Sequence, residues 1–132
     1  MQRKLLAEGL GTLILVMCGL GTGIMGVNLA AGNMAIALLA NAFATGLTLY
    51  LLITVLGPIS GAHLNPAVTL FFTLRREIAP PDALVYVAAQ ATGALLAVGL
   101  THAMFGLAIV QLAATPRQVP LCGCPNGSRP SG

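Results

Sequence analysis

The stretch from Ser60 to Val68 concentrates the polar groups of this chain that could do chemistry; its sequence is Ser-Gly-Ala-His-Leu-Asn-Pro-Ala-Val. Asn65 is a favoured helix N-cap and Pro66 suits the first helical position, so Asn65-Pro66-Ala67 predicts a helix start. If the Asn65 side-chain oxygen caps that helix, its amide group is left to donate hydrogen bonds. An extended backbone would offer acceptor carbonyls at Gly61, Ala62 and His63. This is hydrogen-bonding chemistry that suits small polar molecules in single file.

Two ionisable side chains, Glu8 and His63, lie in apolar surroundings. A carboxylate within a membrane is a functional candidate by default, although Glu8 follows Lys4 by four residues and could instead reach the interface or pair with it. No second ligand is near His63 in the sequence, which argues against a metal site or a proton relay. His102 is most simply a lumenal or interfacial residue. We find no catalytic constellation in the sequence and expect neither an enzyme nor a cofactor.

The composition places the chain in a bilayer. It is 57% hydrophobic and 7% charged, with a mean hydropathy of +0.91, so it has too few ionisable groups for a solvated surface. No basic patch with interleaved aromatics suggests a nucleic-acid partner. The first apolar run follows basic residues like a signal peptide, but it is too long for one and we expect it to be retained. Apolar runs long enough to span about 30 Å of hydrocarbon cover 5–27, 34–56 and 83–112.

The basic residues indicate topology. Arg3 and Lys4 precede the first span and Arg75-Arg76 precede the third, whereas the loop 28–33 has no charge. Both clusters should therefore be cytoplasmic, which puts the N-terminus in the cytoplasm and Arg117 on the opposite side. Cys18 lies in a span and is expected to be a small packing residue. The C-x-C pair in the tail, Cys122 and Cys124, matches neither metal-site spacings nor an even-count disulfide framework, so we assign it neither role.

Small residues spaced four apart occur in each span. Such pairs let helix backbones approach closely in lipid. Glycine and alanine are also simply common in membrane helices, so one pair alone is ambiguous, but three together favour a compact bundle. The pairs are Gly19 and Gly23, Ala42 and Gly46, and Ala89 and Gly93.

The segment after the second span predicts a re-entrant half-helix. Gly57-Pro58 should end that span, and the charged triplet Arg75-Arg76-Glu77 closes the next apolar segment. A helix over 66–74 would reach only about 14 Å, roughly half the hydrocarbon thickness. The irregular backbone before it must line a cavity or be buried in protein. An Asn-Pro-Ala sequence can also be an ordinary helix cap, but the half-span length favours a pore element whose positive N-terminus opposes cations.

The nine residues from Ser60 to Val68 resemble the first signature of the aquaporin and glycerol-facilitator (major intrinsic protein) family. The resemblance extends to Ala7-Glu8-x-x-x-Thr12 and Ala89-Gln90-x-x-Gly93-Ala94, and it covers roughly 5–112. It implies an all-α membrane channel built from two inverted repeats, each with three transmembrane helices and one re-entrant half-helix. Members pass water or small uncharged solutes and are usually tetramers. We therefore expect 1–114 to form one such repeat.

The resemblance also implies roles for individual residues. Asn65 would be the selectivity-related donor, and Glu8 and Gln90 would hold the loop backbone. Counting back from Asn65 places the span-two constriction residue at Thr45, which is smaller than the aromatic residue often found in water-selective members. A complete pore of this type would be wider and would admit glycerol-like solutes. The lumenal carbonyls would come from Gly61, Ala62 and His63.

The chain departs from the family by carrying only one repeat. A second Asn-Pro-Ala and the constriction arginine do not occur, and 115–132 predicts a disordered, atypical tail that we interpret as a premature or frame-shifted end. The shared side of the basic clusters argues against dual insertion, so we expect no efficient transport by this chain alone. One alternative is a non-transporting remnant or a subunit that packs with a separate channel half. Another is a proton-coupled carrier that uses Glu8 and His63. The bacterial plasma membrane is the expected location.

Overall fold

The computed structural model describes residues 1–107, which form four helices and contain no strand. Three helices are long and apolar enough to cross a membrane, and one has nine residues. The helices are α1 (Gln2–Leu29), α2 (Met34–Ser60), α3 (Pro66–Leu74) and α4 (Pro80–Met104). The expected fold class, an all-α membrane protein with three long helices and a half-length one, is confirmed. The predicted tail at 115–132 lies outside the described residues.

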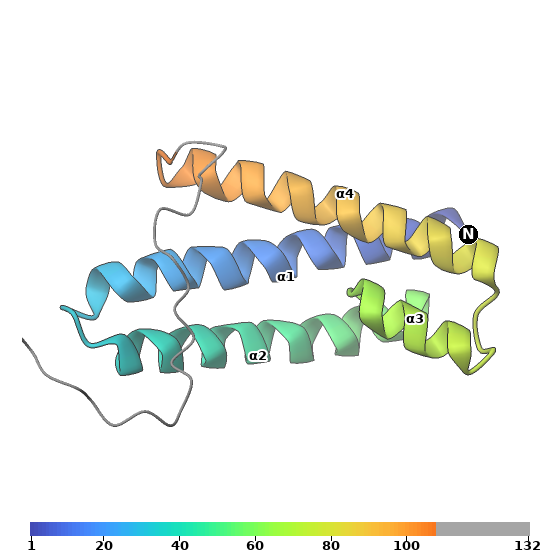
Figure 1. The fold of residues 1–132 in the computed structure, drawn as a ribbon, viewed down its shortest axis with the longest axis horizontal. Helices are drawn as coiled ribbons and strands as arrows, with labels where there is room; N and C mark the ends of the chain where they lie inside the picture. Colours follow the sequence, from blue (N-terminus) through green and yellow to red (C-terminus); the bar gives the residue numbers. More distant parts are fainter. Residues whose placement is uncertain (108–132) are drawn as a thin grey trace, which may run out of the picture.

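Helix α1 is the centre of the bundle and packs along both α2 and α4. Figure 1 shows α1 and α4 running in the same direction with α2 antiparallel to both. The short α3 begins part-way along the bundle and returns to the end at which α1 starts and α2 finishes (Figure 1). The chain therefore enters and leaves at the same end between α2 and α4. This is the path of a re-entrant half-helix, and it brings Arg3-Lys4 and Arg75-Arg76 to one end of the bundle.

Burial in this bundle runs opposite to that of a water-soluble protein. Large apolar side chains such as Leu38, Leu39 and Leu95 are at least 70% exposed. Polar side chains are buried instead, and they include Glu8, Thr12, Ser60, Thr69, Gln90 and Thr101. Glu8, Ser60, Thr69 and Gln90 hydrogen-bond to one another, as a lipid solvent favours, whereas the hydroxyls of Thr12 and Thr101 have no partner among residues 1–107.

Helices α1 and α4 approach closely where glycine faces glycine. A Cβ added at Gly93 would overlap the carbonyl group of Gly9, and one added at Gly9 would lie 3.4 Å from the carbonyl oxygen of Ala89. The predicted Ala89–Gly93 pair is therefore part of a helix crossing. The reason is steric: a side chain at position 93 would collide with the backbone of α1, whereas a Cβ at position 9 would only come into van der Waals contact with α4.

The small-residue pairs on α1 and α2 behave differently from one another. A Cβ at Gly19 or Gly23 would meet side chains of α2 at 3.8 Å, so this pair faces α2. Ala42 and Gly46 are exposed, and a Cβ at Gly46 would touch nothing within 4 Å. The three pairs were expected to favour tight packing of the helices, and the pair on α2 makes no such contact among residues 1–107. That helix instead approaches α1 at Ala37, whose carbonyl oxygen lies 3.2 Å from a Cβ built on Gly26.

The helices differ from the expected spans at the end of α2 and at both ends of α4, and α1 extends two to three residues beyond 5–27 at each end. Helix α2 continues past Gly57 with Pro58 inside it and ends at Ser60, although proline lacks the amide hydrogen that a continuing helix requires. Tertiary hydrogen bonds at Ser60, described below, hold this last turn. Helix α4 begins at Pro80, three residues before the expected start, and ends at Met104. The segment 105–107 is not helical, and 108–112 lie outside the described residues.

Candidate functional site

Five residues, 61–65, lie between α2 and α3, and three of them take a left-handed backbone conformation that reverses the chain. Gly61, Ala62 and Leu64 have φ angles of +91°, +48° and +49°, and Asn65 is extended at −155°. The predicted simple extended path was therefore wrong for most of this loop. A positive φ costs a non-glycine residue roughly 1–3 kcal/mol and persists only where surrounding contacts enforce it. Ala62 and Leu64 must therefore be held by other parts of the protein.

The carboxylate of Glu8 supplies most of that restraint. Its Oε1 accepts hydrogen bonds from Ser60 Oγ at 2.6 Å and from the backbone N–H of His63 at 3.0 Å. Its Oε2 accepts from the backbone N–H of Leu64 at 2.7 Å and from Gln90 Nε2 at 2.9 Å. A carboxylate has about four acceptor positions, and all four are used. Glu8 is fully buried, so this one side chain ties α1 to α4 and to both ends of the loop.

The alternative role for Glu8, at the interface beside Lys4, was wrong. Lys4 is exposed, whereas the Glu8 side chain is 0% accessible. Among residues 1–107, the ion pair that forms joins Arg75 to Glu77 at 2.8 Å, and none joins Lys4 to Glu8. The loop amides satisfy the carboxylate in place of a cation.

Gln90 and Thr69 continue the network from the loop to the half-helix. Gln90 Nε2 donates to Thr69 Oγ1 at 3.0 Å as well as to Glu8. Thr69 Oγ1 donates to the Asn65 carbonyl at 3.2 Å, and His63 Nδ1 lies 3.2 Å from the same hydroxyl. Which of these two groups donates depends on the tautomer of the histidine. The histidine ring is thus oriented by α3.

Two aromatic residues complete the support behind the loop. The His63 ring stacks on Phe72 with centroids 4.7 Å apart and lies tilted to Tyr86 at 5.5 Å. Tyr86 also donates from its hydroxyl to the carbonyl of Ser60 at 3.0 Å, and both residues are buried. This bond and the Glu8 contact both act on Ser60, which explains why α2 keeps its final turn beyond Pro58.

The start of α3 presents the hydrogen-bonding groups that the motif predicts. Asn65 Oδ1 accepts from the backbone N–H of Ala67 at 2.9 Å, and Pro66 occupies the first turn. Asn65, Pro66 and Ala67 are all exposed. In the part of the chain that the structure describes, the Asn65 amide nitrogen has no partner. The carbonyls of residues 61–64 likewise accept no hydrogen bond there. Free donors and free acceptors therefore meet beside one helix end.

Thr45 is the one candidate residue that the structure does not bring to this loop. It lies in α2, and the helical rise puts it about 22 Å along the axis from Ser60. Its hydroxyl faces Asn41 Oδ1 at 3.5 Å, and a Cβ at Gly19 would lie 3.8 Å from it. The proposed constriction and the proposed filter are thus at different depths of the bundle.

Sequence reasoning missed a polar cluster around Thr45 between α1 and α2. Thr22 Oγ1 lies 2.5 Å from Asn41 Oδ1, and Cys18 Sγ lies 3.1 Å from Thr48 Oγ1. The signal was available, because Cys18 and Thr22 are four residues apart, as are Asn41 and Thr45, and such spacing puts side chains on one helix face. Thr69 and Tyr86 were also missed. Tyr86 precedes Gln90 by one helical turn, but nothing local shows that its face meets Ser60.

The arrangement of Glu8 and His63 among residues 1–107 supports neither a metal site nor a proton relay. Among residues 1–107 no group of three His, Cys, Asp or Glu side chains could hold a metal ion. Glu8 contacts the backbone of His63 and not its ring. The side-chain link between them passes through Gln90 and Thr69. A carboxamide does not readily exchange protons, so this link holds positions and makes a poor proton relay.

Comparison with known proteins identifies the family. The family model for major intrinsic protein matches residues 1–120. The aquaglyceroporin AqpS of Rhizobium meliloti (strain 1021) is 44% identical over 120 residues, which cover 91% of this chain and 51% of that protein. The lens fiber major intrinsic protein of Gallus gallus is 38% identical over 107 residues, covering 81% of this chain and 39% of that protein. Aquaporin-5 of Homo sapiens is 38% identical over 100 residues, covering 76% of this chain and 36% of that protein.

These relatives are consistently longer than the matched region, and the chain spans about half or less of their length. The match includes the loop, the half-helix and the helices that carry Glu8 and Gln90. The chain belongs to the major intrinsic protein family.

Proposed function

We propose that this chain supplies one half of the pore of a membrane channel for water or small neutral solutes, without covalent chemistry. The observation that carries the proposal is the exposed start of α3, where the unpartnered Asn65 amide lies beside the unpartnered carbonyls of the loop. The named relatives, which include an aquaporin and an aquaglyceroporin, support the same conclusion. A solute passing there would exchange hydrogen bonds with water for hydrogen bonds with these groups.

In this mechanism the half-helix also discriminates by charge. The N-terminus of α3 carries about half a positive elementary charge, and α3 begins part-way along the long helices, where its first residues are exposed (Figure 1). A cation or proton would meet that charge in a low-dielectric setting, whereas a neutral solute would not. Asn65 donates to the solute oxygen, and carbonyls of Gly61, Ala62 and His63 accept. Glu8 and Gln90 keep these groups in register by holding the loop from behind.

Selectivity among neutral solutes is assigned to Thr45. Its side chain is small, and it lies with Thr22 and Asn41 in a polar cluster of hydroxyl and amide groups. A lumen bordered by such groups would accommodate glycerol-like molecules that can use several hydrogen bonds. A full channel built on this repeat should therefore pass glycerol as well as water.

The proposed pore needs a second half. We assign residues 1–114 to one repeat and expect its partner to be a complementary half with its own half-helix. A parallel homo-oligomer of this repeat alone would leave each half-helix unopposed. Because the basic pairs Arg3-Lys4 and Arg75-Arg76 lie at one end, we place that end and the N-terminus in the cytoplasm. The bacterial relative suggests a bacterial plasma membrane.

The test joins residues 1–114 to the second half of the Rhizobium meliloti relative and reconstitutes this chimera in liposomes. Stopped-flow light scattering should show rapid water and glycerol entry, and the chain alone should stay near the lipid background. Asn65→Ser keeps an N-cap oxygen but removes the amide donor, so it should slow both solutes. Asn33→Ser is the matched control, because Asn33 caps α2 in the same way through the backbone N–H groups of Ala35 and Ile36.

The outcomes separate the alternatives. A folded chimera that does not transport would refute the pore assignment and favour a non-transporting remnant. Swelling at channel rates with the chain alone would refute the need for a second half. Saturable flux that follows a pH gradient would indicate the proton-coupled carrier, which the geometry between Glu8 and His63 does not favour.

A further inference from the structure

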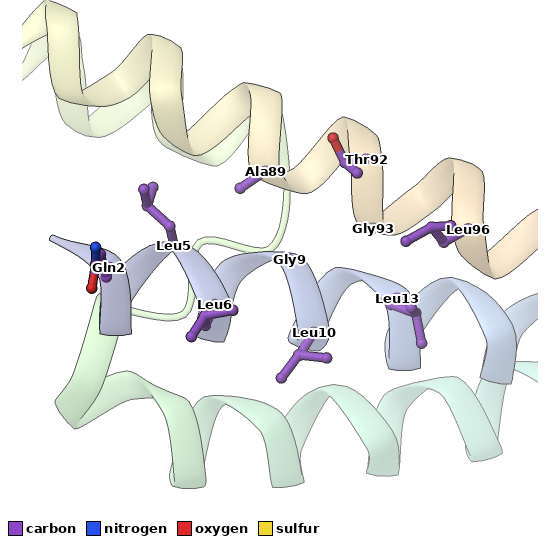
Figure 2. Close-up of a pocket in the computed structure, with 10 residues that line it drawn as sticks. All are labelled: Gln2, Leu5, Leu6, Gly9, Leu10, Leu13, Ala89, Thr92, Gly93 and Leu96. Carbon is purple, nitrogen blue, oxygen red and sulfur yellow. The ribbon is translucent and has the colours of Figure 1, made fainter.

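Helix α1 contacts its two neighbours in different ways. Near its start, Gly9 faces Gly93 of α4, and the two backbones meet there (Figure 2). In its second half, α1 contacts α2 through polar side chains, with the hydroxyl of Thr22 beside the carboxamide of Asn41. Asn41 lies roughly 29 Å along the axis of α2 from Ser60. The bundle therefore has a second polar contact, far from the loop that precedes α3.

The carboxamide of Asn41 is held at its oxygen end. Asn41 Oδ1 lies 2.5 Å from Thr22 Oγ1 and 3.5 Å from Thr45 Oγ1, so one hydroxyl of each helix is directed to it. Thr22 Oγ1 also lies 2.6 Å from the carbonyl oxygen of Cys18, and its one hydrogen is shared between the two acceptors. Among residues 1–107 the amide nitrogen of Asn41 has no hydrogen-bond partner.

The free amide nitrogen of Asn41 is also accessible. Asn41 is half-buried, and its nitrogen is not among the fully buried side-chain atoms that lack a partner in the described part of the chain. On the α1 side it lies over Gly23, where a Cβ would come within 3.8 Å of it and none is present. Asn65 shows the same arrangement, with its oxygen bound within the protein and its nitrogen free. An amide without a partner is costly in hydrocarbon, so this group requires a polar occupant.

We propose that Asn41 is a second solute contact of the pore and that it favours small polyols. The inference rests on the proposed function, because Asn41 and Thr45 are four residues apart and share one face of α2. Asn41 lies about 6 Å nearer than Thr45 to the start of α2, so a solute entering from that end meets it first. Thr22 is a positioning residue that fixes the carboxamide and does not touch the solute.

The chemistry of the solute explains the preference. A polyol that fills a constriction excludes water, and each of its hydroxyl groups then needs a hydrogen-bond partner from the protein. The amide of Asn41 donates to one such hydroxyl oxygen, and the hydroxyl can in turn donate to a neighbouring acceptor. Water molecules in single file hydrogen-bond to one another, so they depend less on this one donor.

Stopped-flow swelling of liposomes that hold the chimeric channel tests the assignment. The measured quantity is the ratio of glycerol to water permeability, which does not depend on the amount of inserted channel. Asn41→Leu keeps the size of the side chain and removes its hydrogen bonds, so the ratio should fall roughly three- to tenfold, the factor that one neutral hydrogen bond supplies. Thr54→Val is the matched control and should leave the ratio unchanged, because the Thr54 hydroxyl on the same helix donates to the carbonyl of Tyr50.

Two variants of Thr22 separate positioning from packing. Thr22→Val keeps the branched shape but removes the hydroxyl beside Asn41 Oδ1, so the ratio should fall by part of the Asn41→Leu effect. Thr22→Ser keeps the hydroxyl and removes a methyl group, and it should retain the ratio of the unaltered channel. A role in packing alone predicts the reverse order, with Thr22→Ser the more harmful of the two.

The outcomes separate this inference from the proposed function. An unchanged ratio in Asn41→Leu, with water permeability retained, would overturn the role of Asn41 and leave the pore assignment intact. Equal loss of both permeabilities in Asn41→Leu and Thr22→Val would also overturn it, because the cluster would then only join helices or channel halves. An unaltered chimera that passes neither solute would overturn the proposed function and this inference with it.

Discussion

Replacing Glu8 with glutamine should release the loop between α2 and α3 while leaving the long helices in place. The carboxylate accepts four hydrogen bonds, from Ser60 Oγ, the backbone N–H groups of His63 and Leu64, and Gln90 Nε2. Glutamine has nearly the same shape, but its side chain has one oxygen with two acceptor positions, and its amide group would face two other donors.

The size of the effect follows from that count. At least two of the four buried donors would lose their acceptor, at about 1–3 kcal/mol each, so the loop should be weakened by about 2–6 kcal/mol. The left-handed residues Ala62 and Leu64 would add to the tendency to open, because Glu8 restrains the backbone next to each. A loss of this size is large against a typical folding free energy of about 5–15 kcal/mol.

Hydrogen–deuterium exchange in detergent measures this loosening locally. Exchange of the amides of His63 and Leu64 should accelerate by roughly 30-fold to 10⁴-fold in Glu8→Gln, since each 1.4 kcal/mol changes an opening equilibrium about tenfold. The matched control is Glu77→Gln, which removes an exposed carboxylate paired with Arg75 and should shift stability by less than about 1 kcal/mol. The loop amides should then exchange as in the unaltered chain.

Unchanged exchange at His63 and Leu64 in Glu8→Gln would refute the reasoning. It would mean that the aromatic and Tyr86 contacts behind the loop hold it without the carboxylate. Equal acceleration across α1, α2 and α4 would also contradict it, because the effect would then be a general loss of folding.

Three further predictions concern packing, the end of α2 and selectivity. Gly93→Ala should lower stability by about 1–3 kcal/mol in a detergent unfolding titration, because its Cβ would overlap the backbone of α1, whereas Gly99→Ala, which faces open space, should be nearly neutral. Tyr86→Phe should lower stability by about 1–3 kcal/mol, since it leaves the buried carbonyl of Ser60 without a donor, and an unchanged unfolding midpoint would contradict this. In the chimeric channel, Thr45→Phe should reduce glycerol entry at least tenfold while water entry persists, and equal loss of both solutes in stopped-flow swelling would argue against a size filter at this position.

Local sequence signals predicted the half-helix well. The Asn-Pro pair at 65–66 and the charged triplet after Leu74 gave a helix over 66–74, and α3 has these bounds. Both signals act within a few residues: the asparagine oxygen reaches the amide of Ala67, and proline is pre-organised for the first turn. The same kind of reasoning failed at Gly57-Pro58, because hydrogen bonds from Tyr86 and to Glu8, far away in sequence, extend α2 to Ser60.

It was harder to predict which side of each helix packs against another helix. Gly19 with Gly23 and Ala42 with Gly46 have identical spacing, yet the first pair meets α2 and the second is exposed. A uniformly apolar helix gives no amphipathic pattern from which its buried face could be read. The polar cluster of Thr22, Asn41 and Thr45 marks the interface between α1 and α2 more clearly than the small residues do.

By itself the sequence determined that this is a membrane protein with three spans and a half-helix, because these follow from the lengths of its apolar runs. It also determined which residues begin the half-helix, because capping is local. Only the tertiary structure decided that one carboxylate of α1 accepts four hydrogen bonds from three other segments, and that the loop it holds is left-handed. The physical reason is that a buried acceptor needs donors within about 3 Å, and a strained backbone needs contacts that hold it. The packed helices supply both, from residues as far as 82 positions away in the chain.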